Sequence, residues 1–278
     1  MIIDFRVRPS TPELVSVAEN RVFKGMMQWL DFRTETEDLD TLAVALREEG
    51  ITKAVVQGRD LETTYGWKVT NDHIAEIVNK HPDMFIGFAG ADPWKGMAAV
   101  REIQRAVTEL GLAGVSVDPY MHQMYCNDAR YYPIYAKCTE LGVPVEITAG
   151  PGAFVPGAVI DHVAPRYVDF VARDFPELKI IVSHGGYPWV AEMITVALRN
   201  RNVYFEISAY ETMPGSDLYV KAANDGLIDK KLLYASAHPF VNFRKCLRTW
   251  DNLPFKDEVR RRVMYENAAQ LLGLDLAT

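Results

Sequence analysis

The sequence has few cysteines, no long hydrophobic run and no excess of basic charge. Its three cysteines are Cys126, Cys138 and Cys246, and no two form a Cys-x-x-Cys pair, so neither a disulfide framework nor a zinc knuckle is expected. No run reaches the roughly 18 uncharged apolar residues of a membrane span. The net charge of −7 argues against nucleic acid or an anionic membrane as partner, since both would require a basic surface.

The composition favours a folded chain with a large core. Hydrophobic residues make up 49% and charged residues 24% of the sequence, which argues against disorder. A length of 278 residues suits one α/β barrel of roughly 250 residues or two smaller domains. The amino-terminal segment carries Asp4 where a signal peptide would carry basic residues. We therefore expect a mature, cytoplasmic chain.

Short runs rich in Val and Ile alternate with longer helical patterns, a rhythm typical of βα units around a parallel sheet. Eight such runs predict strands, at residues 2–8, 51–57, 85–91, 114–118, 144–149, 179–184, 203–208 and 231–237. Apolar residues at three-to-four spacing predict helices between them, at residues 39–49, 97–110, 132–140, 167–175, 189–198 and 218–224. Glycines 50, 111 and 142 follow predicted helices, where a left-handed cap is favoured.

Eight strands with helices between them most simply close into a barrel. We predict an α/β fold, a single (β/α)8 TIM barrel that forms one domain over residues 1–278. Two connections, 9–38 and 150–164, are long and follow the carboxyl ends of strands, where barrel enzymes build their sites. Each could be a lid over a pocket, a surface excursion or an oligomer contact.

Polar side chains gather where the predicted strands end. Arg6 and Arg8 on strand one share a face because they are two residues apart. The other strand-end candidates are Arg59, Asp118, Glu146, Thr148, His184, Glu206, Ser208, Ser236 and His238. Two guanidinium groups inside a barrel need carboxylates or a bound anion beside them.

These residues allow a structural and a functional interpretation. Arg6 and Arg8 could serve as internal struts by pairing with Glu146, Asp118 or Glu206. They could instead bind an anion, which we favour. His184, which precedes two glycines, could be a hydrogen-bonded core histidine or a catalytic group. The other histidines, apart from His238, lie in predicted helices or loops and are expected to be structural.

Several short segments occur in a characteristic order along the chain. They are Ile3-Asp4, Asn71-Asp72, Lys80-His81-Pro82-Asp83, Ile86-Gly87-Phe88-Ala89, Glu109-Leu110-Gly111-Leu112-Ala113-Gly114-Val115, Leu141-Gly142-Val143-Pro144-Val145, Phe175-Pro176-Glu177-Leu178-Lys179-Ile180-Ile181, Ser183-His184-Gly185-Gly186-Tyr187-Pro188-Trp189 and Glu266-Asn267-Ala268-Ala269-Gln270-Leu271-Leu272. This order resembles the amidohydrolase superfamily of metal-dependent hydrolases, in particular the branch of aminocarboxymuconate-semialdehyde decarboxylase and related decarboxylases, hydratases and lactonases. The resemblance covers nearly the whole chain and implies a homodimer.

The resemblance also implies a metal site, built from a His-x-His on strand one, a His on strand five, a His on strand six and an Asp on strand eight. The corresponding positions here hold Arg6 and Arg8, Thr148, His184 and Ala237. Arginine cannot bind a cation, because its guanidinium has only donors and stays protonated. Zinc requires three or four N, S or O ligands, and only His184 among these positions matches the family's ligands. We therefore expect no metal ion, zinc included, and no other cofactor.

The expected function is metal-independent, amidohydrolase-like hydrolysis, with lactone or other ester-like C–O bonds of a small carboxylated substrate as the target. The resemblance includes the 2-pyrone-4,6-dicarboxylate lactonases, which work without a metal. One alternative is a decarboxylase or hydratase of an unsaturated dicarboxylate. Another is a non-catalytic pseudo-enzyme that binds an acidic metabolite.

Each candidate residue has an expected role. The residues expected to bind substrate are Arg6, Arg8, Arg59, Glu146, Thr148 and Ser208, with the arginines holding carboxylates. The candidates for proton transfer are His184, Asp118, His238 and Glu146. We favour His184 as general base and place Asp118 second.

Overall fold

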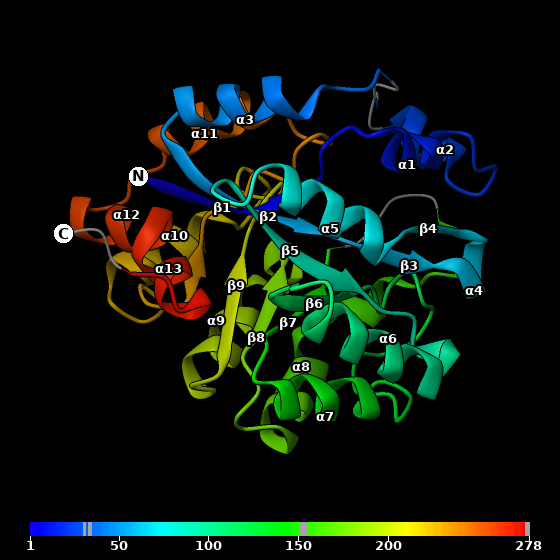
Figure 1. The fold of residues 1–278 in the computed structure, drawn as a ribbon. Helices are drawn as coiled ribbons and strands as arrows, with labels where there is room; N and C mark the ends of the chain where they lie inside the picture. The colour runs from blue at the N-terminus through cyan, green and yellow to red at the C-terminus, as the bar shows by residue number, and fades with distance from the viewer. Residues whose placement is uncertain (30–31, 33–34, 151–154, 276–278) are drawn as a thin grey trace.

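The structure, a computed structural model, describes residues 1–29, 32, 35–150 and 155–275. Eight parallel strands form one sheet in the order β1-β2-β5-β6-β7-β8-β9-β10, with helices arranged around it (Figure 1). The strands are β1 (Ile2–Val7), β2 (Ile51–Gln57), β5 (Phe85–Gly90), β6 (Gly114–Val117), β7 (Val145–Thr148), β8 (Ile180–Ser183), β9 (Val203–Glu206) and β10 (Leu232–Leu233). All eight predicted strands are present.

The two ends of the sheet approach each other. The Phe5 N–H donates to the Tyr234 carbonyl at 3.0 Å, and Val7 pairs with His238 in a single parallel bridge. The sheet is therefore a nearly closed barrel, and the predicted (β/α)8 TIM-barrel fold is confirmed. β10 covers only Leu232–Leu233, much less than the predicted 231–237, because the following residues bond to β1 irregularly.

The helices lie mostly between the strands along the chain. They are α1 (Pro12–Val15), α2 (Lys24–Trp29), α3 (Leu39–Glu48), α4 (Glu62–Tyr65), α5 (Asn71–Lys80), α6 (Met97–Thr108), α7 (Tyr132–Leu141), α8 (Pro165–Asp174), α9 (Val190–Arg199), α10 (Asp217–Asn224), α11 (Phe243–Asn252), α12 (Asp257–Arg261) and α13 (Asn267–Leu272). The six helices predicted from periodicity are confirmed, with ends that differ by at most two residues.

Local chemistry explains where these helices begin and end. Asp38 caps α3 by accepting the Thr41 N–H at 2.9 Å, and Thr70 caps α5 by accepting the His73 N–H at 3.2 Å. α7 ends at Gly142, whose φ of 68° lies in the left-handed region that glycine tolerates best. The predicted cap glycines 50 and 111 also have positive φ angles.

One hairpin was not predicted. β3 (Arg59–Leu61) and β4 (Trp67–Val69) form an antiparallel pair after β2, so Arg59 begins a strand of its own. Strands of three residues carry too little alternation to be recognised from sequence. The long connections contain short helices, α1 and α2 in 9–38 and a 3-10 turn at Ile160–Val163 in 150–164. Part of each connection lies outside the described residues, and the lid prediction stays a prediction.

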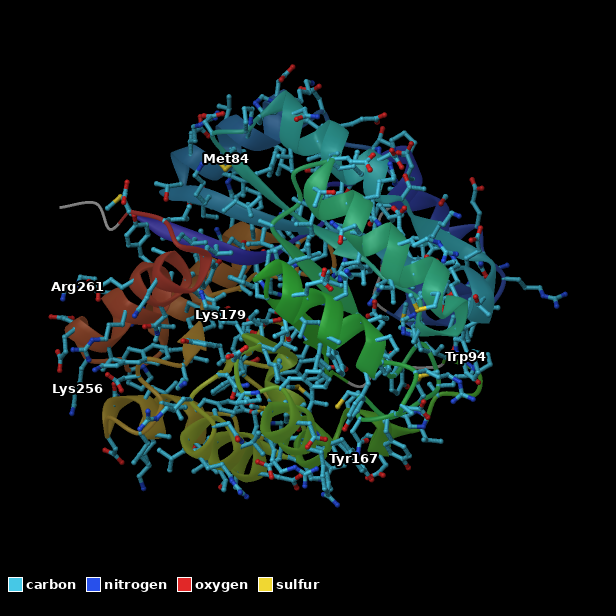
Figure 2. The ribbon with its side chains drawn as sticks, turned by 60° about the horizontal axis from the view of Figure 1, so that its bottom comes forward. Met84, Trp94, Tyr167, Lys179, Lys256 and Arg261 are labelled. Atoms are coloured by element: carbon cyan, nitrogen blue, oxygen red, sulfur yellow. The ribbon has the colours of Figure 1, made fainter. Side chains whose placement is uncertain are left out.

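A layer of apolar side chains fills the barrel on the amino-terminal side of the arginines. It is formed by Ile3, Phe5, Val55, Phe88, Ile181 and Leu233, with Ala268, Ala269 and Leu271 of α13 against it. Figure 2 shows Lys179 near the red carboxyl-terminal helices, and its Nζ donates to the Leu271 carbonyl at 2.9 Å. In the described part of the chain, no helix combines the length and hydropathy needed to cross a membrane.

Candidate active site

Arg6 reaches across the barrel to the opposite strand β7. Its Nη1 forms an ion pair with Glu146, and its Nη2 donates to the Thr148 hydroxyl at 3.3 Å. Arg6 and Glu146 are both fully buried. Burial raises the pKa of the Glu146 carboxyl above its ordinary value, although the charges of Arg6 and Arg8 act against this. For Arg6, the structure therefore contains the internal pairing that the sequence left open.

Arg59 and Asp118 form a second buried ion pair at the same end of the barrel. Arg59 Nε donates to Asp118 Oδ2 at 3.0 Å and Nη2 donates to Oδ1 at 2.6 Å, a bidentate arrangement. Burial opposes the charge of Asp118, but the nearby cations, Arg59 foremost, outweigh it and hold the pKa of this carboxyl well below its ordinary range. Both carboxylate oxygens of Asp118 are thus occupied by Arg59.

Arg8 differs from the other two arginines. It is only 5% exposed, and its Nε and Nη2 are buried and form no hydrogen bond with any residue that the structure describes. Burial, together with the charges of Arg6 and Arg59, lowers the pKa of Arg8 well below its ordinary value. A buried, unpaired guanidinium is unfavourable by several kcal/mol, so this position calls for an anion.

His184 follows β8 and lies beside Ser208, which follows β9. Its Nδ1 is 2.8 Å from the Ser208 carbonyl oxygen and 3.2 Å from the Ser208 hydroxyl. Because a carbonyl oxygen only accepts, we assign the ring proton to Nδ1, which leaves the lone pair on Nε2. Burial, then the charge of Arg6, lowers the pKa of His184 well below its ordinary value, so the imidazole is neutral at pH 7.

Glu206 at the end of β9 is fully buried beside His184. One carboxylate oxygen accepts the His184 N–H at 3.2 Å and the other accepts the Ser208 N–H at 2.5 Å. Burial raises the pKa of Glu206 to about 7, despite the opposing charge of Arg6. The carboxyl therefore joins the ends of two adjacent strands.

His238 lies after β10 and is bonded to the long connection after β1. Its Nε2 is 2.9 Å from Glu37 Oε1. Burial opposes the charge of Glu37, but its hydrogen bond and charge interaction with His238 lower the pKa of this carboxyl below its ordinary value. The Arg8 N–H donates to the His238 carbonyl at 2.8 Å, so the backbone places Arg8 and His238 next to each other.

The strand ends thus bring the predicted residues to one end of the barrel in linked groups. These groups are Arg6 with Glu146 and Thr148, Arg59 with Asp118, His184 with Ser208, and Arg8 with His238. Two residues of this region were not predicted, Glu37 and Gln57, and the Gln57 Nε2 donates to the Phe5 carbonyl at 2.9 Å. Gln57 could have been found as the polar residue that ends an apolar run, whereas Glu37 carries no local signal.

The fold and these strand-end groups define the class, a (β/α)8-barrel protein with a cluster of charged side chains at the carboxyl ends of its strands. The chain belongs to the amidohydrolase family, whose sequence profile matches residues 25–274. A gamma-resorcylate decarboxylase from a Rhizobium species is 32% identical over 247 residues, 74% of this chain and 75% of the relative.

Two further curated relatives match over shorter segments. A 2-keto-4-carboxy-3-hexenedioate hydratase from a Sphingobium species is 28% identical over 60% of this chain, and the match spans 56% of the hydratase. A 2-amino-3-carboxymuconate-6-semialdehyde decarboxylase from Dictyostelium discoideum is 32% identical over 42% of this chain and 36% of its own length. The chain therefore spans about half or less of these two relatives.

Solved structures share the barrel along the whole chain. An uncharacterized TIM-barrel protein from Bordetella bronchiseptica has a TM-score of 0.82 and 29% identity, with 98% of both chains covered. A dihydroxybenzoic acid decarboxylase from Polaromonas, crystallised with manganese and 2-nitroresorcinol, has a TM-score of 0.73 and 21% identity over 99% of this chain and 98% of its own. A 2,6-dihydroxybenzoate decarboxylase bound to 2,6-dihydroxybenzoate has a TM-score of 0.75 and 19% identity over 98% of this chain and 99% of its own.

These comparisons correct the predicted reaction. The curated relatives are decarboxylases and a hydratase, which are lyases. The predicted hydrolase, with lactone or ester-like C–O hydrolysis, is therefore wrong, and the alternative of decarboxylation or hydration agrees with them. The physical reason for the error is that arginines and a histidine at a barrel mouth suit any reaction that holds a carboxylate and moves a proton.

The comparisons also correct the expectation that no cofactor is used. The Polaromonas decarboxylase holds manganese, and so does a 5-carboxyvanillate decarboxylase from Novosphingobium aromaticivorans, with a TM-score of 0.71 and 18% identity over 99% of this chain and 96% of its own. The side chains described here do not fit such an ion, since no three of the described His, Cys, Asp and Glu residues are placed together so that they could hold a metal ion. The chemical steps assigned to this chain therefore use only its own residues.

Proposed function

We propose that the chain is a lyase that acts on a small carboxylated substrate, with decarboxylation as its reaction and hydration of a carbon–carbon double bond as the second candidate. The observation that carries the proposal is the buried guanidinium of Arg8, whose Nε and Nη2 have no partner among the described residues. The curated relatives, which are decarboxylases and a hydratase, support the reaction class.

The two unpartnered atoms of Arg8 are suited to a carboxylate. Nε and Nη2 are the same pair that Arg59 uses for its bidentate contact with Asp118. Planar guanidinium and carboxylate groups match in this geometry, and the charged hydrogen bonds are strong where water is excluded. We assign Arg8 to a substrate carboxylate, and Arg6 and Thr148 to the adjoining part of the substrate.

The carboxylate at Arg8 is not the one that leaves. A departing carboxylate loses its charge as it becomes CO2, so a bidentate guanidinium would stabilise the substrate more than the transition state and slow the reaction. The same guanidinium helps if it holds a carboxylate that the product keeps. This favours a dicarboxylic acid, one carboxylate of which is lost.

His184 is assigned to proton transfer. When the carbon–carbon bond to the departing carboxylate breaks, its electron pair stays on the substrate carbon and a proton must replace CO2. A neutral imidazole with a free lone pair on Nε2 can take a proton from a substrate hydroxyl or from water and return it to that carbon. In hydration the same atom would take a proton from water, hydroxide would add to one carbon and the proton would go to the other.

The other predicted bases are less suited to this task. Both oxygens of Asp118 are held by Arg59, so neither is free to take a proton from the substrate. His238 uses Nε2 for its contact with Glu37. We assign Asp118 to the orientation of Arg59, Glu146 to the orientation of Arg6, and His238 to the orientation of the backbone beside Arg8.

Binding and turnover test the proposal separately. Hydroxylated benzoates, benzene dicarboxylates and unsaturated aliphatic dicarboxylates are supplied with and without manganese, and CO2 release and loss of conjugated absorbance are recorded. We expect turnover of a dicarboxylate, and about 10- to 100-fold weaker binding in Arg8→Met, as for the loss of charged hydrogen bonds. Arg166→Met, which breaks an exposed pair with Glu192, is the matched control and should bind normally.

Each outcome has a distinct meaning. If acids bind and Arg8→Met weakens them, but no acid is consumed with or without manganese, the lyase proposal is wrong and the pseudo-enzyme alternative holds. Equal binding by Arg8→Met and the parent protein would refute the role of Arg8. The homodimer, the cytoplasmic location and the single domain over residues 1–278 are also parts of the proposal. Light scattering tests the homodimer and limited proteolysis tests the single domain. Fractionation of the cells that produce the chain tests its location.

A further inference from the structure

The carboxyl of Glu206 makes an unusual pair of contacts. The side chain is fully buried, yet both oxygens accept hydrogen bonds from backbone N–H groups, that of His184 at 3.2 Å and that of Ser208 at 2.5 Å. His184 follows β8 and Ser208 follows β9, and these strands are parallel neighbours. One carboxylate therefore joins the two loops that carry the proposed proton-transfer group and its hydrogen-bond acceptor.

The backbone of His184 needs such support. Its φ angle is 58°, in the left-handed region, and Gly185 and Gly186 follow with φ angles of 62°. A side chain with a Cβ is disfavoured there by roughly 1–2 kcal/mol, so the surrounding contacts must hold this turn in place. The bond from the His184 N–H to Glu206 is a contact that directly stabilises the turn.

Glu206 also fixes the partner of the imidazole. Ser208 donates its N–H to Glu206 and places its carbonyl oxygen 2.8 Å from His184 Nδ1. The carboxylate thus sets both the backbone from which the imidazole projects and the acceptor that keeps the proton on Nδ1. We propose that Glu206 is a positioning residue that fixes the ring orientation and the tautomer of His184.

A simple ion-pair role does not explain these contacts. Arg6 is the cation whose charge acts on Glu206, but its guanidinium bonds to Glu146 and Thr148. No hydrogen bond or ion pair between Arg6 and Glu206 occurs among the described residues. In its charged form, above a pKa of about 7, Glu206 instead offers two acceptors to two donors. An amide cannot do so, because one end of an amide is a donor.

The test is Glu206→Gln, which keeps the size of the side chain and replaces one acceptor by a donor. Protein labelled with 15N at histidine reports the protonated ring nitrogen by long-range 1H–15N NMR, and His184→Asn assigns the signal. We expect a proton on Nδ1 of His184 in the parent protein, and in Glu206→Gln a mixture of tautomers or a proton on Nε2. Asp229→Asn, which alters a buried carboxyl paired with Arg262, is the control and should leave the signal unchanged.

Kinetics supply a second readout, which rests on the proposed lyase activity. Loss of a group that orients a functional histidine lowers activity by about 10- to 100-fold, and we expect this in kcat with KM nearly unchanged. If Glu206→Gln does not fold, Glu206→Asp, which keeps the charge but withdraws it by one methylene, takes its place in both measurements.

The two readouts separate the inference from the proposed function. An unchanged His184 spectrum in a folded variant overturns the positioning role, whatever the activity. A changed spectrum supports it even if the parent protein consumes no carboxylic acid, a result that would refute only the lyase. If Glu206→Gln lowers both kcat and the melting temperature but leaves the His184 spectrum unchanged, Glu206 has only a structural role.

Discussion

Asp4 shows how a single buried carboxyl couples the barrel to pH. Its side chain is fully buried on β1, and Oδ1 accepts the Arg6 N–H at 3.1 Å and the Ser236 N–H at 2.9 Å. Burial raises the pKa of Asp4 from 3.8 to about 6, although these hydrogen bonds act against it. The charged form is therefore disfavoured in the folded chain.

The sign of the resulting pH dependence follows from that shift. Between pH 3.8 and about 6 the folded chain keeps the Asp4 proton and the unfolded chain has lost it, so the free energy of unfolding falls as the pH rises through this range. The stabilisation lost is about 3 kcal/mol, since one pKa unit corresponds to about 1.4 kcal/mol. Asp4→Asn keeps an acceptor at Oδ1 and removes the titration.

Urea denaturation of the parent protein and Asp4→Asn at several pH values between 4 and 7 measures this effect. We expect Asp4→Asn to gain stability relative to the parent as the pH rises. A constant difference between the two proteins across the range would show that Asp4 does not titrate there. Because both proteins share every other ionisable group, only the difference between their curves is interpreted.

Among the secondary-structure elements, β2 and β5 approach each other so closely at their ends that glycine is required. A Cβ on Gly90 would lie 2.5 Å from the Arg59 nitrogen and 2.7 Å from the Gly58 carbonyl carbon, both backbone atoms. The Gly58 N–H donates to the Phe88 carbonyl at 2.8 Å in the same region. The position of Arg59, and with it the pair with Asp118, therefore depends on the absence of a side chain at residue 90.

We expect Gly90→Ala to lower the free energy of unfolding by about 3 kcal/mol, the upper part of the usual overpacking cost, and to weaken the binding of carboxylic acids. The matched control is Gly50→Ala. Gly50 has a φ of 78°, and a Cβ added there would meet no atom within 4 Å, so its substitution should cost about 1–2 kcal/mol and leave binding unchanged. Chemical denaturation and titration with an acid that the parent binds check both parts, and equal behaviour of the two variants would contradict the argument.

The register of β1 is a second feature of the elements that governs the site. Asp4 pairs with Ala54 and Val7 with Val56, so three steps on β1 match two on β2. Such a bulge redirects side chains. Phe5 joins the apolar layer with Phe88, and the next residue, Arg6, also reaches the barrel interior, where it meets β7. Strict alternation along β1 would have placed these neighbours on opposite faces.

For the molecule as a whole, the three buried cysteines can show whether the chain unfolds in a single cooperative transition. Cys126 lies before α7, Cys138 within it and Cys246 in α11, and all are buried. Burial raises the pKa of each thiol, so each is both covered and protonated in the folded chain. A thiol reagent should therefore react with none of them before the chain unfolds.

Pulsed thiol labelling followed by mass spectrometry of peptides tests this prediction. We expect no labelling in native buffer, three labelled thiols in guanidinium, and equal labelling rates for the three positions under unfolding conditions, because a single domain loses its core at once. Early labelling of Cys246 alone would contradict a single domain over the full chain.

Charge also differs between the whole molecule and its site. The chain carries a net charge of −7, whereas three arginines, Arg6, Arg8 and Arg59, lie at one end of the barrel. Arg6 and Arg59 are each paired with a carboxylate there. Net charge describes the surface that a polymer or membrane would meet. It does not describe an interior site, where individual pairs decide which ligand is stabilised.

The eight strands of the barrel, six of its helices and its closure follow from sequence patterns alone, because periodicity and caps are local and eight βα units have few ways to pack. The sequence also placed the arginines and His184 at strand ends. Which charges are paired follows from the tertiary structure. Among the residues that the structure describes, Arg6 and Arg59 meet carboxylates from distant strands and Arg8 meets none, while Glu206 bonds to two backbone amides. The physical reason is that pairing depends on distances of a few ångströms between segments far apart in sequence, and a one-residue bulge in β1 is enough to change them.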